Sequence, residues 1–473
     1  MKILLVVPPG KEQSKYKGGL LDFSSPPLGL AYIAAYLREN GYTKIKIIDS
    51  HALNLTYNDF ERIVQYYKPD IVGIQVMTPN FSDVKKTSQI SKNHGAIVIA
   101  GGQHPTFKPL ETLKELQADY IVFGEGEETF LELIEHIERN LDITKVKGIG
   151  YYRNQQYQCN KPRKIKENID EYPIPARDLL PLEKYHILGS KFPATTIISS
   201  RGCPFGCDFC SVSYFYGKKW RPRSPEKIAE ELQIIKELGY LAAAFVDDLL
   251  FIKERRVQDI SKTIYKSVEK PFFWGATTRV DLLSSKTMEM MVNSGCRMVF
   301  AGVESGNQVA LDSIKKNITI RTIETFFKKT RQNKLDTIAS FVYGLPGDTK
   351  QSINATTNWI IKKLDPDLAL FTIATPYPGT PFYDRAYEQG AILEKDYSKF
   401  TLFNPILKIN NLEREEVKVL VKEAYKKFYL RPEKVFTNTK RELQYALESY
   451  GLKMFLKNGL AFSKGLIGMR NLL

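Results

Sequence analysis

A chain of 473 residues is too long for one ordinary hydrophobic core, so two or three domains are expected. Its 43% hydrophobic and 26% charged residues are typical of a globular protein and exclude an intrinsically disordered one. The net charge of +15 permits an anionic partner, but the lysines are scattered and such charges usually only solvate a surface. The apolar opening from Ile3 to Val7 is too short to cross a bilayer and lacks a cleavage site, so we expect a cytoplasmic protein.

Short β-rich runs alternate with amphipathic helical stretches over residues 1–145. Such alternation predicts parallel strands joined by right-handed crossovers, and hence a doubly wound, Rossmann-like α/β domain. The expected strands are Lys2–Val7, Ile45–Asp49, Ile71–Val76, Ile97–Ala100 and Tyr120–Phe123.

Residues 146–192 break this rhythm with scattered prolines and charges, and we expect a linker there. A second β/α series over residues 193–385 shows about six units, fewer than the eight of a closed barrel, and so predicts an incomplete (β/α)6 barrel. Residues 386–473 turn helical and basic and predict a small helical C-terminal region. The strands expected in the second series are Thr195–Ser200, Ala242–Val246, Phe272–Thr277, Met298–Val303, Ile338–Tyr343 and Leu368–Ala374.

Three of the five cysteines fall within eight residues, directly after the first strand of the second series. Clustered thiols in a reducing compartment indicate a metal site. A structural zinc ion would need a fourth ligand close in sequence, and none is in reach. A four-iron cluster held by Cys203, Cys207 and Cys210 would leave one iron open for a substrate, which favours catalysis.

The pattern Cys-x-x-x-Cys-x-aromatic-Cys at the opening of a β/α barrel resembles the radical S-adenosylmethionine superfamily. This resemblance implies a [4Fe–4S] cluster that cleaves S-adenosylmethionine to a 5′-deoxyadenosyl radical, with Phe209 at the cofactor. It further implies that Asp247, at the second strand end, receives the methionine amino group, and that Glu304 binds the ribose. Arg279 would pair with the cofactor's carboxylate or form a plain surface ion pair.

The first domain resembles cobalamin-binding domains at four positions after its third and fourth strands: Thr78, Gly101, Gly102 and His104. Small residues there would let the nucleotide tail of cobalamin enter the sheet edge, where doubly wound sheets bind ligands. No cysteine precedes Cys159, which excludes the methylthiotransferases with their second cluster. Asp49-Ser50-His51 echoes a cobalt-binding Asp-x-His motif in the wrong sequence context, so we expect His51 to be a surface histidine rather than a cobalt ligand.

Together these resemblances imply a cobalamin-dependent radical enzyme that methylates an unactivated carbon of a small-molecule or lipid-like substrate. The alternative within the class is oxidative ring closure, as in the anaerobic magnesium-protoporphyrin ester cyclase. A low-potential electron donor, flavodoxin or ferredoxin, is the implied partner. The alternative of another class is a basic, zinc-stabilised nucleic-acid-binding protein. The sequence has no motif of basic and aromatic residues that would recognise nucleic acid, so we expect no nucleic-acid partner.

The C-terminal tail carries no acidic residue after Glu448, while basic and apolar side chains alternate. Such a helix can lie in the headgroup layer of an anionic membrane, so the alternative to a purely cytoplasmic protein is one that associates with a membrane through this tail. The same residues could instead cover the open side of the incomplete barrel. The basic residues are Lys453, Lys457, Lys464 and Arg470.

Overall fold

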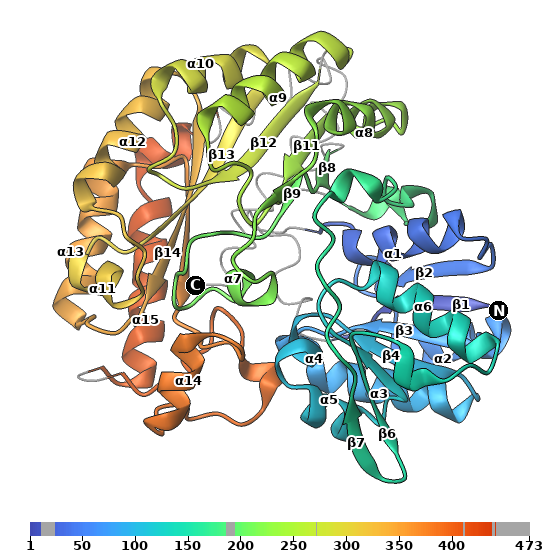
Figure 1. Ribbon diagram of the computed structural model, residues 1–473. Coiled ribbons are helices and arrows are strands. Elements are labelled where there is room, and N and C mark those ends of the chain that lie inside the picture. The colour runs from blue at the N-terminus through green and yellow to red at the C-terminus, as the bar shows by residue number, and fades with distance from the viewer. Residues whose placement is uncertain (11–23, 186–193, 271, 410–411, 438–439, 441–473) are drawn as a thin grey trace.

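The computed structural model describes the chain except for residues 11–23, 186–193, 271, 410–411, 438–439 and 441–473. Two β-sheet units face each other across a central region, one built on a seven-stranded sheet and the other on a six-stranded sheet (Figure 1). The tail expected to touch a membrane lies outside the described residues. None of the helices in the described part of the chain combines the length and apolar character needed to cross a membrane.

The N-terminal sheet has the strand order β2-β1-β3-β4-β5-β6-β7, and its first five strands are parallel. Strand β1 is buried on both faces: Ile3 and Leu5 pack under one helical layer, and Leu4 and Val6 under the other. Helices therefore cover both faces, which confirms the doubly wound domain. The parallel strands are β1 (Ile3–Val7), β2 (Ile45–Asp49), β3 (Ile71–Gln75), β4 (Ile97–Gly101) and β5 (Tyr120–Val122). The helices are α1 (Leu28–Glu39), α2 (Tyr57–Tyr67), α3 (Phe81–Asn93), α4 (Gln103–Phe107), α5 (Pro109–Leu116) and α6 (Glu127–Glu138).

A hairpin occupies the start of the segment expected to be a linker. Strands β6 (Ile149–Arg153) and β7 (Gln156–Cys159) add to the N-terminal sheet in antiparallel fashion. Their turn residues Asn154 and Gln155 have φ of 50° and 62°, the left-handed pair that a tight hairpin turn requires. The N-terminal sheet thus continues past residue 145, and only the chain after the hairpin has the irregular character expected of residues 146–192.

The second sheet is parallel throughout, with the order β15-β14-β13-β12-β11-β8. Its strands curve round with the helices on the outer side, an incomplete barrel as predicted (Figure 1). The strands are β8 (Ala194–Ile197), β11 (Ala242–Phe245), β12 (Phe273–Thr278), β13 (Cys296–Glu304), β14 (Asp336–Tyr343) and β15 (Leu368–Ile373). The larger helices are α8 (Pro225–Glu237), α9 (Glu254–Ser267), α10 (Ser285–Asn293), α12 (Ile320–Gln332), α13 (Lys350–Trp359), α14 (Pro381–Glu388) and α15 (Arg414–Tyr429).

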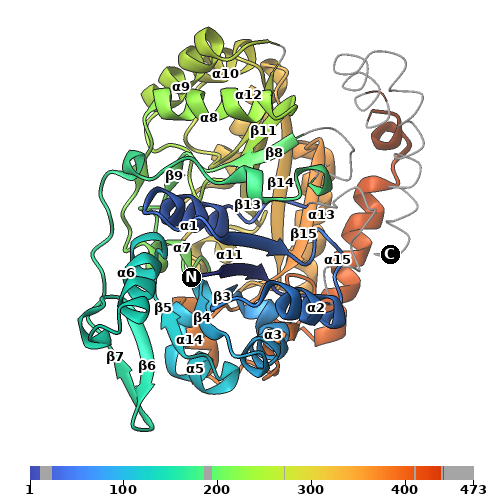
Figure 2. The same ribbon diagram turned by 90° about the vertical axis from the view of Figure 1, so that its right-hand side faces the viewer.

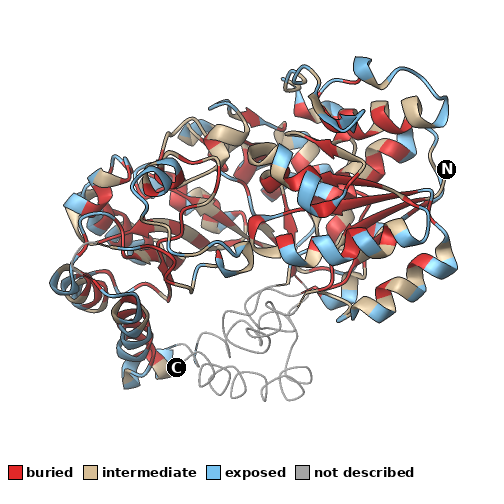
Figure 3. Cartoon of the chain, turned by 90° about the horizontal axis from the view of Figure 1, so that it is seen from below, coloured by how far each residue is buried: buried red, intermediate tan, exposed pale blue. Residues whose placement is uncertain are grey.

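Local sequence explains where these helices begin. Ser224 caps α8 by accepting from the backbone N–H of Lys227, and Pro225 occupies the first helical position, where its missing N–H costs nothing. Thr319 caps α12 in the same way. Buried positions concentrate on the strands and the inward helix faces, while the outward helix faces are exposed (Figure 3). Both cores therefore form between a sheet and the apolar stripes of its helices.

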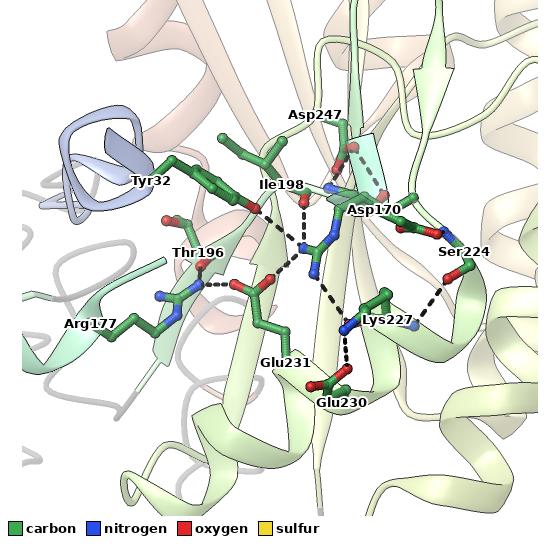
Figure 4. A network of polar contacts seen from close by, with 12 residues as sticks. Tyr32, Asp170, Arg177, Thr196, Ile198, Ser224, Lys227, Glu230, Glu231 and Asp247 are labelled. Carbon is green, nitrogen blue, oxygen red and sulfur yellow. Dashed lines mark hydrogen bonds and ion pairs between the residues drawn. The ribbon is translucent and has the colours of Figure 1, made fainter. Parts of the chain in front are cut away.

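A buried ionic network joins the two units (Figure 4). Glu231 of α8 is fully buried and pairs with Arg177, 2.6 Å away, and with Arg223. Arg223 also donates to the hydroxyl of Tyr32 on α1, so the network reaches the N-terminal unit. Because Arg177 lies in the irregular segment between the sheets, this segment is fixed against the barrel.

The chain returns to the N-terminal unit after the barrel. The short helix η8 (Tyr397–Lys399) packs beside α3, and the Tyr397 ring contacts the rings of Phe81 and His104. Its hydroxyl donates to Glu111 of α5 at 3.1 Å. Helix α15 then lies along the edge strand β15 (Figure 2). Among the described residues after 386, the chain is mostly irregular up to α15, and α15 supplies the helical character predicted for this region.

Candidate functional site

A cavity of about 890 Å³ lies between the two sheets. The carboxyl ends of the N-terminal strands contribute Val7, Asp49 and Gln75, and those of the barrel contribute Thr196 and Val342. Parallel sheets of both kinds bind ligands at these strand ends. The cavity is therefore where two cofactor sites could meet, one from each unit.

The cysteine motif forms a loop between β9 (Ser200–Arg201) and α7 (Val212–Phe215), and Cys210 lines the cavity. Gly202 starts this loop with φ of +88°, and a Cβ there would overlap the carbonyl oxygen of Lys219. Its N–H donates to Asp248 at 3.0 Å. The glycine lets the chain turn sharply, so the three cysteines lie in one compact loop.

Burial raises the pKa of the Cys203 thiol, and it raises that of Cys210 to about 12. A metal binds the thiolate, which is the form that burial disfavours. The positive charge of a bound metal would offset this effect of burial. Within the described residues, no three His, Cys, Asp or Glu side chains converge on a point that would hold a single metal ion. A four-iron cluster binds its thiolates on separate irons and can be held by three cysteines, whereas a structural zinc ion takes four protein ligands.

Arg279 follows β12 and lies against the cysteine loop rather than on the surface. Its guanidinium stacks over the Phe205 ring at 3.9 Å, and Nη1 lies 4.0 Å from the Sγ of Cys207. It forms a two-bonded ion pair with Asp281, at 3.0 Å for each bond, and is only 7% exposed. Arg279 is therefore buried beside the loop, while its partner Asp281 is exposed. A contact between Arg279 and the carboxylate of S-adenosylmethionine stays a prediction.

Glu304 ends β13 in a strained conformation, with φ of +68° and a shift in strand register. Its carboxylate accepts from the Nζ of Lys316 at 2.7 Å, and both side chains are buried. Burial alone would lower the pKa of Lys316, but the charges of Glu304 and Cys207 prevail and raise it. A strained carboxylate held at a strand end is the kind of feature found at binding sites.

Lys316 escaped the sequence reasoning because it follows a six-residue helix, α11 (Gln308–Ser313), and belongs to no motif. Its Nζ lies 5.9 Å from the centre of the Phe209 ring, and Phe209 itself lines the cavity. The structure thus brings together Phe209, Arg279 and Glu304, three of the four residues predicted for S-adenosylmethionine, and adds Lys316 to them.

Asp247 and Asp248 face different surroundings. One oxygen of Asp247 accepts from the N–H and Oγ of Ser199 and from the Oγ of Ser200, while its second oxygen is buried without a hydrogen-bond partner. Burial raises the pKa of Asp247 to about 6. Asp248 instead accepts from Gly202, at the start of the cysteine loop, and the sequence reasoning passed over it. Asp247 therefore braces β8 and β9, and Asp248 is the carboxylate beside the cysteines.

On the N-terminal side, Thr78 lines the cavity and contacts His104, with 3.1 Å between Oγ1 and Nδ1. His104 is buried between Phe81 and Tyr397, behind the cavity wall, and its Nε2 has no hydrogen-bond partner. Burial lowers the pKa of His104 to about 4. Gln103 and Phe107, from the same helix, line the cavity instead.

The two predicted glycines differ from each other. A Cβ on Gly102 would lie 2.5 Å from the carbonyl oxygen of Val76, and its φ is +126°. A Cβ on Gly101 would come no closer than 3.8 Å to any neighbouring residue's heavy atoms. The protein's own backbone thus requires glycine at 102, whereas at 101 an added Cβ would make only ordinary van der Waals contacts with Val122.

His51 is half-buried and lines the cavity. The expectation that it is not a cobalt ligand stays a prediction. It follows β2, and its N–H donates to Asp49 at 3.1 Å. The other oxygen of Asp49 accepts from the hydroxyl of Tyr185 at 3.1 Å, which fixes the carboxylate at the cavity wall.

Residues 19–134 match the B12 binding domain family, and residues 197–360 match the Radical SAM superfamily. The chain is 38% identical over 436 residues to an uncharacterized methyltransferase of Pyrococcus horikoshii, covering 91% of this chain and 93% of that protein. It is a radical S-adenosylmethionine enzyme with a B12-binding domain.

Other proteins share the architecture of this radical enzyme. The anaerobic magnesium-protoporphyrin IX monomethyl ester cyclase of Rubrivivax gelatinosus is 29% identical over 92% of this chain and 79% of its own length. The cobalamin-dependent enzyme OxsB superposes with a TM-score of 0.72 at 16% identity, over 95% of this chain and 71% of that one. TsrM of Kitasatospora setae gives 0.69 at 16% identity, over 84% and 77%. These solved structures show a shared fold.

The two domains give this radical enzyme the predicted cofactors: a [4Fe–4S] cluster, S-adenosylmethionine and cobalamin. The residues present fit them. Three thiols share one loop with Arg279 beside it, and Thr78 and Gln103 line the cavity at the carboxyl ends of the N-terminal strands, where doubly wound sheets bind ligands. Family membership also removes the zinc-stabilised nucleic-acid-binding protein as an explanation of the cysteines.

Proposed function

We propose that this enzyme methylates an unactivated carbon of a largely uncharged substrate held between its two sheets. The observation that carries the proposal is the single cavity lined both by the N-terminal strand ends and by Phe209 and Cys210 of the cysteine loop. Relatives include the hopanoid C-3 methylase of Methylococcus capsulatus, 28% identical over 80% of this chain. A shared cavity would bring a methyl donor and a radical source to the same substrate carbon.

The cofactors supply the reactive groups: methylation consumes two molecules of S-adenosylmethionine and two electrons, and releases methionine, 5′-deoxyadenosine carrying the substrate hydrogen, and S-adenosylhomocysteine. Cys203, Cys207 and Cys210 would hold the cluster. Arg279 places a positive charge 4.0 Å from the Sγ of Cys207, beside the loop that would hold the cluster. The electrons would come from a low-potential donor such as flavodoxin or ferredoxin.

Glu304 and Asp248 would hold S-adenosylmethionine. Glu304 ends a barrel strand, and its contact with Lys316 fixes the position of the carboxylate. A carboxylate accepts from both hydroxyls of a ribose, which suits Glu304 to that part of the cofactor. Asp248 accepts a hydrogen bond from Gly202 at the start of the cysteine loop. It is therefore better placed than Asp247 to receive an amino group at the cluster.

The cavity wall favours a substrate without phosphate or carboxylate groups. Among the described residues that line it there is no lysine or arginine, and the acidic one is Asp49. An anionic substrate would lack the cations that normally pair with it. Apolar side chains such as Leu28, Met77 and Phe382 line much of the remaining wall, which supports a lipid-like or other poorly soluble substrate.

The test is to incubate anaerobically reconstituted enzyme with a small-molecule extract and S-adenosylmethionine carrying a labelled methyl group. Transfer of label to an extract component, together with 5′-deoxyadenosine, supports methylation. The second candidate function, oxidative ring closure, rests on the cyclase relatives that cover most of this chain. It predicts 5′-deoxyadenosine and a product that has lost hydrogen without gaining label.

A further inference from the structure

A turn of the N-terminal unit holds the cysteine loop of the barrel. The turn runs from Gly124 to Gly126, between β5 and α6, and Glu127 is the first residue of α6. The carboxylate of Glu125 accepts from Arg201 at 2.9 Å and from both terminal nitrogens of Arg221 at 2.8 Å each. Glu127 accepts from Arg201 at 2.6 Å. Two carboxylates of one unit thus bind two guanidiniums of the other.

The two arginines stand at the ends of the segment that contains the cysteines. Arg201 in β9 pairs directly with Arg221 in β10 (Arg221–Pro222), so the short antiparallel ladder closes residues 201–221 into one loop. Arg201 is separated from Cys203 by a single residue, Gly202. The position of the cluster ligands therefore depends on where these two guanidiniums are held.

The network is buried and balanced in charge. The Arg201 side chain is 9% exposed and that of Glu125 is 11% exposed. The Arg201 guanidinium also lies between the rings of Tyr32 and Tyr172, at 5.0 and 4.9 Å. Removing one partner of such a pair leaves an uncompensated buried charge, so the network resists separation of the units.

We infer that Glu125 and Glu127 are positioning residues that couple cobalamin binding in the N-terminal unit to the stability of the cluster in the barrel. Cobalamin bound at the strand ends of the first sheet would favour one position of the N-terminal unit relative to the barrel. The ion pairs of Glu125 and Glu127 would then hold the cysteine loop in the matching position. Coupling between two sites is reciprocal, so each cofactor stabilises the other. The inference rests on the proposed function only in requiring that both cofactors bind, and not on methyl transfer.

The experiment measures how fast an iron chelator removes the cluster from the reconstituted full chain, with and without hydroxocobalamin. We expect cobalamin to slow chelation about fivefold or more in the wild type, the lower end of typical coupling. In Glu125→Gln this ratio should fall close to one. Arg221→Lys should do the same, because lysine keeps the charge and loses the two-pronged contact.

Glu128→Gln is the matched control. Glu128 follows Glu127 on α6 but pairs with Arg163 and Lys166, at 3.8 and 3.0 Å, and its variant should keep the wild-type ratio. A merely structural role for Glu125 would speed chelation equally with and without cobalamin and leave the ratio unchanged, which would overturn the inference. So would cobalamin that binds, by its absorption spectrum, without slowing chelation in the wild type. Failure to bind cobalamin at all would remove the proposed function as well.

Discussion

Two adjacent glycines at the end of β4 give a sharp test of the cobalamin site. Alanine at Gly102 would sit at φ of +126° with its Cβ 2.5 Å from the Val76 carbonyl oxygen. The backbone conformation costs about 1–3 kcal/mol, and relieving the overlap costs about another 1–3 kcal/mol. We expect Gly102→Ala to lower the free energy of unfolding by about 2–6 kcal/mol, the sum of these ranges.

Alanine at Gly101 meets only ordinary contacts with Val122, so the free energy of unfolding should stay within about 0.5 kcal/mol of the wild type. Its methyl group would instead occupy space at the edge where the cofactor tail is expected. Overpacking of about 1–3 kcal/mol against the bound cofactor corresponds to a loss of affinity of about 5- to 150-fold.

The assay combines urea titration of the full chain, followed by far-ultraviolet circular dichroism, with spectral titration of hydroxocobalamin. Comparing transition midpoints avoids assuming that a chain of this size unfolds in two states. A Gly102→Ala variant as stable as the wild type would refute the close-approach argument. A Gly101→Ala variant with unchanged stability and unchanged cobalamin affinity would refute placement of the cofactor tail at this edge.

Three further predictions address the barrel and the domain contact. Replacing any one of the three loop cysteines by alanine should abolish bound iron and sulfide after anaerobic reconstitution, while Cys159→Ala, on exposed β7, should retain them. Lys316→Met should lower the free energy of unfolding by about 3–5 kcal/mol because it leaves Glu304 buried without a counter-charge; adding Glu304→Gln should recover part of the loss, and no recovery would contradict the pairing. Burial lowers the pKa of His104 from 6.5 to about 4, so as the pH falls the unfolded chain binds a proton before the folded chain does. The free energy of unfolding therefore decreases below pH 6.5, by about 2 kcal/mol between pH 7 and pH 5. Urea midpoints should show this contribution missing in His104→Gln; an identical pH dependence in both proteins would speak against the buried neutral ring.

The strands were predictable because their residues are patterned for burial. Strand β2 begins and ends where the apolar run predicts, and the ends of the predicted barrel strands differ from the observed ends by at most three residues. The β6–β7 hairpin was missed because its turn, Asn154-Gln155, lacks the glycine that usually marks such turns. The prolines that follow it, which do belong to irregular chain, made the whole segment look like a linker.

Site residues that belong to a short sequence motif could be predicted, whereas residues that depend on contacts between distant parts of the chain could not. Cysteine spacing identified the loop at once. Lys316 could not be found because its importance comes from Glu304, twelve residues earlier, and from the fold that buries both. The choice between Asp247 and Asp248 likewise depends on side-chain direction at an irregular strand end.

Helix α15 protects the edge strand of the incomplete barrel from pairing with another chain. The hydroxyl of Tyr429 accepts from the N–H of Ala369 and donates to its carbonyl, and the hydroxyl of Tyr425 accepts from the N–H of Phe371. Two phenols thus take hydrogen bonds that a neighbouring strand would otherwise make along β15. An unprotected edge of this kind is a template for pairing with another chain. A chain cut before residue 414 would expose that edge, and we expect such a product to aggregate even though every residue of the cofactor loop is intact.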